Sequence, residues 1–154
     1  MPDAISPASP LSTPGMLTVT MEIPITAPLT QVWTALTTQV GLWWPRDFLV
    51  ATEPQQMQFE PRLGGRLFEE GTHGGGAIWY TVYAITPATS IDLVGNLSPA
   101  FGGPAQSLLR LALREQGTTT ILALTDAVVG NVGARSAASL DDGWRAIFER
   151  GLKA

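Results

Sequence analysis

Short runs in which apolar and polar residues alternate follow one another along most of this 154-residue chain. The first is Leu17–Ile25, in which every second residue is apolar. A period of two predicts a strand with one buried face, and Pro24 places this strand at a sheet edge or near its own end. Further strands are predicted at Phe48–Thr52, Met57–Glu60, Arg66–Glu70, Ala77–Ile85, Ile91–Val94, Leu109–Arg114 and Thr118–Leu124.

Two segments have the spacing of a helix instead. Ala27-Pro28 opens the first, because proline is tolerated at the start of a helix, and apolar residues then recur three and four positions apart up to Leu36. The second closes the chain, and Ser139 with Asp142 resembles a capping box at its start. Its apolar face is formed by Leu140, Trp144, Ile147, Phe148 and Leu152.

A meander of short strands needs cover for its apolar face, and the terminal helix is the element available to provide it. The predicted fold class is therefore α+β, with a curved antiparallel sheet of about seven strands wrapped around the C-terminal helix. We expect one domain over residues 17–154, preceded by a disordered leader rich in proline and serine over residues 1–16.

Composition narrows the possible partners. The chain has no cysteine, so disulfides and thiolate chemistry are excluded. Its net charge is −4 and it has no basic block, which argues against nucleic acid and anionic membranes. Neither a signal peptide nor an apolar run long enough for a membrane span is recognised, and we expect a cytoplasmic protein. Only 14% of residues are charged, against a usual ~25%, as expected for a protein that encloses an apolar cavity or simply has a charge-poor core.

Four motifs occur in an order that resembles the SRPBCC, or START-like, superfamily, and within it the group of chaperone-ATPase activator homologues. They are Ala27-Pro28 with the helix through Thr37, Trp43-Trp44-Pro45, the segment Glu60–Arg66 followed by Glu69, and Gly117-Thr118 with the later Gly143-Trp144. The resemblance implies the helix-grip fold and a cavity between sheet and helix that holds an apolar small molecule. Leu67 departs from the aromatic residue common in that group, and the terminal helix is short.

Glu69 is the one candidate for a catalytic group. It adjoins Glu70, and because neighbouring strand residues point to opposite faces, one of the two carboxylates must face the concave side. The family pattern favours Glu69. An ion pair of Glu69 with Arg62 or Arg66 at the sheet rim is the alternative. Glu60 is expected to pair with Arg62, and Asp126 to cap the turn after its strand.

Other residues carry weaker indications. His73 lies in a glycine-rich turn and is expected to be solvated; neither a metal site nor a cofactor is predicted. Gly143 and Gly151 are expected to leave space beside the terminal helix. The predicted ligand-binding residues are Leu36, Trp44, Phe48, Phe59, Glu69, Trp79, Leu93, Leu111, Trp144, Ile147 and Phe148.

The first functional hypothesis is binding of an apolar or aromatic small molecule by a monomer or homodimer. A polyketide cyclase-like or hydrolase-like enzyme that uses Glu69 is the second. The third is an interaction domain that modulates a chaperone ATPase, as the resemblance implies.

Overall fold

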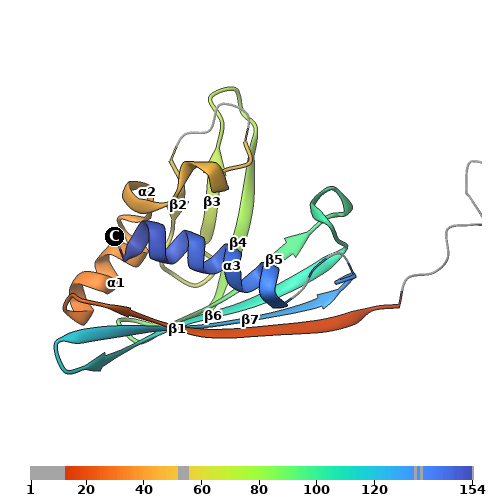
Figure 1. The fold of residues 1–154 in the computed structure, drawn as a ribbon. Coiled ribbons are helices and arrows are strands. Elements are labelled where there is room, and N and C mark those ends of the chain that lie inside the picture. Colours follow the sequence, from red (N-terminus) through yellow and green to blue (C-terminus); the bar gives the residue numbers. More distant parts are fainter. Residues whose placement is uncertain (1–12, 52–55, 134, 136, 154) are drawn as a thin grey trace, which may run out of the picture.

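The computed structural model describes residues 13–51, 56–133, 135 and 137–153 (Figure 1). Seven strands are present: β1 (Gly15–Ile25), β2 (Gln58–Phe59), β3 (Arg66–Glu70), β4 (Gly76–Thr86), β5 (Ser90–Leu97), β6 (Ala105–Gln116) and β7 (Thr119–Gly130). The helical elements are α1 (Leu29–Thr37), α2 (Val40–Trp43), η2 (Arg46–Phe48), η3 (Pro99–Phe101), α3 (Ala137–Ile147) and η4 (Phe148–Leu152). This is the predicted α+β class.

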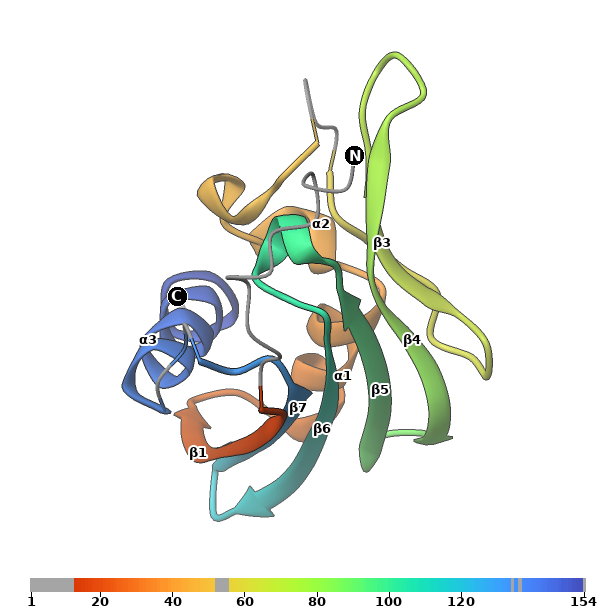
Figure 2. The ribbon, with the colours of Figure 1, turned by 90° about the vertical axis from the view of Figure 1, so that its right-hand side faces the viewer.

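The strands form one antiparallel sheet in the order β1-β7-β6-β5-β4-β3-β2. Strands β6 and β7 are a long hairpin, and β1 pairs with β7 over its full length, so that Pro24 lies in an edge strand as predicted. The register shifts between Leu67 and Phe68 and again between Val82 and Ala84. Such irregularities bend a sheet, and Figure 2 shows the sheet curving around the helices on its concave side.

The helices cover this concave face because each presents apolar residues to it. Val32 and Leu36 of α1 are buried, as are Trp144, Ile147 and Phe148 from α3 and η4. They pack against inward residues of the long strands, among them Ile23, Leu111 and Leu124. Apolar residues two positions apart along the strands and three or four positions apart along the helices therefore pack into one core. Each helix of the described chain is too short or too polar to cross a bilayer.

Several predicted boundaries differ from the structure. The predicted strand Phe48–Thr52 is wrong where the structure describes it, because its start belongs to the tight turn of η2, in which the Phe48 amide donates to the Pro45 carbonyl. Strand β7 continues six residues past Leu124. Helix α3 already includes Ser139, which is therefore not its N-cap. Strand β1 begins at Gly15, and residues 1–12 of the predicted leader lie outside the described part.

Candidate functional site

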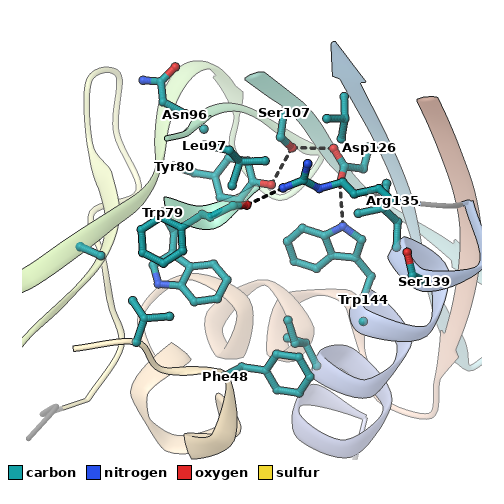
Figure 3. A pocket seen from close by; sticks show the side chains of 18 of the residues that line it. Phe48, Trp79, Tyr80, Asn96, Leu97, Ser107, Asp126, Arg135, Ser139 and Trp144 are labelled. Carbon is teal, nitrogen blue, oxygen red and sulfur yellow. Dashed lines mark hydrogen bonds between the residues drawn. The ribbon is translucent and has the colours of Figure 1, made fainter. Parts of the chain in front are cut away.

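A cavity of about 340 Å³ lies between the sheet and α3 (Figure 3). Val50, Ile78 and Phe101, which line it, are about half exposed, whereas Asp126, Val128 and Ile147 are buried. The cavity is thus open at one end and closed by buried residues at the other. Its lining comprises Phe48, Val50, Ala77, Ile78, Trp79, Tyr80, Gly95, Asn96, Leu97, Phe101, Ser107, Asp126, Val128, Arg135, Ser139, Leu140, Gly143, Trp144 and Ile147.

The predicted ligand-binding residues divide between this cavity and a packed part of the core. Phe48, Trp79, Trp144 and Ile147 line the cavity. Leu36, Trp44, Phe59, Leu93, Leu111 and Phe148 instead surround a void of only about 20 Å³ under α1 and α2, which Trp144 also borders. A void of that size holds about one water molecule at most. These six side chains therefore belong to the packed core or lie against it.

The closed end of the cavity, called the floor below, is formed by Tyr80, Ser107, Asp126 and Trp144. The Ser107 hydroxyl donates to Asp126 Oδ1 at 2.5 Å, and Trp144 Nε1 donates to Asp126 Oδ2 at 2.8 Å. The Tyr80 hydroxyl lies 2.6 Å from Ser107 Oγ. Because the single hydrogen of Ser107 is directed at Asp126, Tyr80 must be the donor in that contact. The network therefore runs from Tyr80 through Ser107 to Asp126, with Trp144 joining from the helix.

Sequence spacing explains how these groups meet. On β7 the residues Leu122, Leu124, Asp126 and Val128 alternate on the inward face, so that the carboxylate points at α3. On β6, Ser107 continues the inward row of Leu109 and Leu111. The predicted cap role of Asp126 is wrong, because the strand does not end before it. Following the period of two past Leu124 would have placed it inward.

Tyr80 occupies space that a glycine leaves free. A Cβ atom on Gly95 would lie 2.9 Å from the Tyr80 ring and 2.5 Å from the Trp79 carbonyl oxygen. Only glycine therefore lets β4 and the Tyr80 ring approach β5 so closely. Burial raises the pKa of the Tyr80 hydroxyl well above its usual value, and the negative charge of Asp126 adds to the rise. The hydroxyl is thus a hydrogen-bond donor throughout the physiological range.

Glu69 does not line the cavity but holds part of its wall. It is 1% exposed, and its carboxylate accepts hydrogen bonds from the backbone amides of Val50 and Ala51 and from Trp79 Nε1 at 2.6–2.9 Å. Its inward direction agrees with the strand parity. The expected ion pair with Arg62 or Arg66 is wrong: Arg66 pairs with Glu60 at 2.9 Å, and Arg62 lies 3.8 Å from Glu60.

Arg135, which the sequence analysis did not single out, holds together the part of the cavity wall that Glu69 does not contact. Its guanidinium donates to the carbonyl oxygens of Phe101, Gly102 and Asn131 at 2.7–3.2 Å. It thereby ties the η3 turn, which carries Phe101, to the segment that leads into α3. No local pattern marks this residue, because two of its three partners, the carbonyls of Phe101 and Gly102, lie more than thirty residues away in the sequence.

The two glycines of the terminal helix differ. Gly143 lines the cavity, and a Cβ atom there would have no neighbour within 4 Å, as the prediction of free space required. At Gly151 the same atom would lie 2.7 Å from the Trp43 ring, which fills the space. The prediction is therefore right for Gly143 and wrong for Gly151.

The remaining polar candidates lie elsewhere. His73 is exposed in the turn between β3 and β4. Over the described ranges, no three His, Asp or Glu side chains gather as a metal ion would require.

Comparison with known proteins bears on the family. The family model described as Activator of Hsp90 ATPase homolog 1-like protein matches residues 26–154. A search of curated proteins found no significant match.

Solved structures share the fold. Protein MLL2253 from Mesorhizobium loti is 25% identical, with a TM-score of 0.66 over 88% of this chain and 93% of its own. A protein from Rhizobium leguminosarum is 18% identical, with a TM-score of 0.68 over 92% and 94%. DynU16, from the dynemicin biosynthetic locus, is 18% identical, with a TM-score of 0.55 over 86% of this chain and 45% of its own. With the seven-stranded sheet that grips a terminal helix and a family match over most of its length, this chain belongs to the Activator of Hsp90 ATPase homolog 1-like family of the SRPBCC superfamily.

Proposed function

We propose that the protein binds a small, mainly apolar molecule in the cavity between the sheet and α3. The observation that carries the proposal is the contrast between the two parts of the core: about 340 Å³ is free at one end and about 20 Å³ at the other. Protein interiors are close-packed, so a large opening lined by Phe48, Trp79 and Leu140 needs a reason. Ligand sites of proteins typically occupy about 300–1,000 Å³.

The walls supply the area for binding and the floor supplies orientation. Burial of apolar surface contributes roughly 25 cal/mol per Å², and five aromatic residues are among those that line the cavity. Glu69 and Arg135 hold the two walls through backbone contacts, so the cavity is largely formed before a ligand enters. SRPBCC proteins of this type typically bind small ligands, which agrees with this use of the cavity.

The other two hypotheses have less support. An enzyme that uses Glu69 would need a carboxylate in reach of substrate, whereas both oxygens of Glu69 accept bonds from the protein and the residue does not line the cavity. The family name refers to an ATPase activator, and modulation of a chaperone ATPase stays a prediction from the resemblance.

Filling the cavity from α3 tests the proposal. Gly143→Leu places a side chain in the free space, and Ala138→Leu adds the same side chain at an exposed position of the same helix. In titrations followed by fluorescence of the neutral probe N-phenylnaphthylamine, we expect saturable binding by the wild type and by Ala138→Leu. For Gly143→Leu we expect affinity at least about tenfold lower, since one buried leucine removes space for several ligand atoms. Unaltered binding by a folded Gly143→Leu protein, or no saturable binding by the wild type, would refute the proposal.

A further inference from the structure

The hydrogens of the cavity floor are all used within the protein. The Tyr80 hydroxyl donates to Ser107, the Ser107 hydroxyl donates to Asp126, and Trp144 Nε1 donates to the other oxygen of Asp126 (Figure 3). A hydroxyl or an indole has one donor hydrogen each. The floor can therefore donate no further hydrogen bond to a molecule in the cavity.

Acceptor capacity remains at the same place. A carboxylate offers about four lone-pair sites, and the contacts of Asp126 occupy two of them. The hydroxyl oxygens of Tyr80 and Ser107 also retain lone pairs. All three residues line the cavity, so these lone pairs lie beside the space that a ligand would fill.

The charge of Asp126 adds a second requirement. The residue is 2% exposed, and among the described residues no Lys or Arg forms an ion pair with it. Its two partners are neutral donors. A buried carboxylate is costly unless it is well paired, and a further donor, above all a charged one, would stabilise it. The aromatic rings of Tyr80 and Trp144 nearby are favourable neighbours for a cation.

We infer that the ligand inserts a hydrogen-bond donor, a hydroxyl or a protonated amine on an apolar body, into the floor and directs it at Asp126. This inference rests on the proposed function and specifies the class of ligand. The same geometry discriminates against ligands whose inner end only accepts hydrogen bonds, such as a carboxylate, a ketone or an ether. Such a group would face acceptors alone and would lose its hydration without compensation.

Arg135 is the cation that lines the same cavity, and it defines the competing arrangement. Its guanidinium already donates to three carbonyl oxygens of the wall. A ligand carboxylate that bound there would reverse the preference expected from the floor. The test therefore includes an acid with the same apolar body.

A matched series decides the question by isothermal titration calorimetry of the full chain at neutral pH. The probes are naphthylethylamine, naphthylethanol, the methyl ether of naphthylethanol, naphthylacetic acid and ethylnaphthalene. We expect the amine and the alcohol to bind at least about tenfold more tightly than the ether and the acid, the difference expected for one good hydrogen bond to a charged acceptor. The amine should bind most tightly. Tightest binding of the acid or the ether would overturn the inference.

Asp126→Asn replaces one acceptor oxygen by a donor of the same size and should remove most of the preference for the amine. Asp92→Asn is the control, because Asp92 pairs with Arg110 outside the cavity lining and carries the same charge. If Asp126→Asn does not fold, the ranking by the wild type still decides. Binding of all five probes without a preference would refute this inference and leave the proposed function in place. Binding of none would refute both.

Discussion

Two buried carboxylates, Glu69 and Asp126, have different surroundings and therefore different roles. The oxygens of Glu69 face backbone amides and an indole of the cavity wall. Those of Asp126 face a hydroxyl and an indole at the floor, where space remains beside them. The sequence singled out the first as a candidate catalytic group and missed the second. The structure assigns the first to positioning and leaves the second accessible from the cavity.

Replacing Glu69 tests its positioning role. Glu69→Gln keeps the size of the side chain but turns one acceptor into a donor opposite the amides of Val50 and Ala51 or the Trp79 indole. We expect the free energy of unfolding to fall by about 1–3 kcal/mol, because a buried donor loses its acceptor. Urea denaturation measures this. The control is Glu70→Gln, an exposed neighbour on the same strand, for which we expect a change within about 0.5 kcal/mol. Equal losses in the two variants would contradict the assignment.

At the scale of elements, the terminal helix has a glycine on each part of the core. Gly143 in α3 faces the cavity, and Gly151 in η4 lies against Trp43. The sequence predicted the same role for both, since glycine in an apolar helix face indicates close approach or free space alike. Close approach applies at Gly151 because of Trp43, whose indole donates to the Ala35 carbonyl and is held there by α1.

The same substitution at the two glycines should have opposite effects. Gly143→Ala adds a methyl group to free space and removes the conformational cost of glycine in a helix, so the free energy of unfolding should rise by up to about 1 kcal/mol. Gly151→Ala pushes a methyl group into the ring and backbone of Trp43, and overpacking of this kind costs about 1–3 kcal/mol. Thermal and urea denaturation of both variants measure the difference. A loss of stability at Gly143, or a gain at Gly151, would contradict this description of the helix.

Elements with an unbroken period were predictable, and those whose ends depend on distant partners were not. The strand from Ala77 to Ile85 agrees with β4 to within one residue at each end. Strand β7 was predicted to end at Leu124 with Asp126 as a cap of the following turn, whereas Asp126 lies on the inward face of the continuing strand. The Asp126 carboxylate is stable on the inward face because Ser107 and Trp144, from two other elements, donate hydrogen bonds to it. The partners of Glu69 and Arg135 were likewise beyond local patterns, since they include backbone atoms of distant turns.

In the whole molecule, the core consists of a packed part and a hollow part. The core is filled under α1 and α2, and it is hollow where the cavity lies between the sheet and α3. Trp144 borders both parts. Trp79 of the cavity wall packs edge to face against Trp44 of the packed part, with 5.3 Å between the ring centroids. The sequence predicted a chamber between the sheet and the terminal helix but not which part of that interface is hollow, because a filled core and an apolar cavity require the same residue types.

Strand β5 contributes one leucine to each part, which allows stability and binding to be separated. Leu93 is 1% exposed beside the small void, and Leu97, on the same face of the strand, lines the cavity. We expect Leu93→Ala to lower the free energy of unfolding by about 2–5 kcal/mol, because the packed core cannot close the new space. Its affinity for N-phenylnaphthylamine should stay within about threefold of the wild type, since the side chain lies outside the cavity.

Leu97→Ala should give the reverse result. The side chain is partly exposed, so its loss should cost about 1 kcal/mol or less, whereas the cavity loses apolar contact area and the probe should bind several-fold more weakly. Urea denaturation and fluorescence titration of both variants provide the two measurements. If both substitutions lowered stability and affinity in equal proportion, the core would be a single unit, and the cavity would be a packing irregularity without a function of its own.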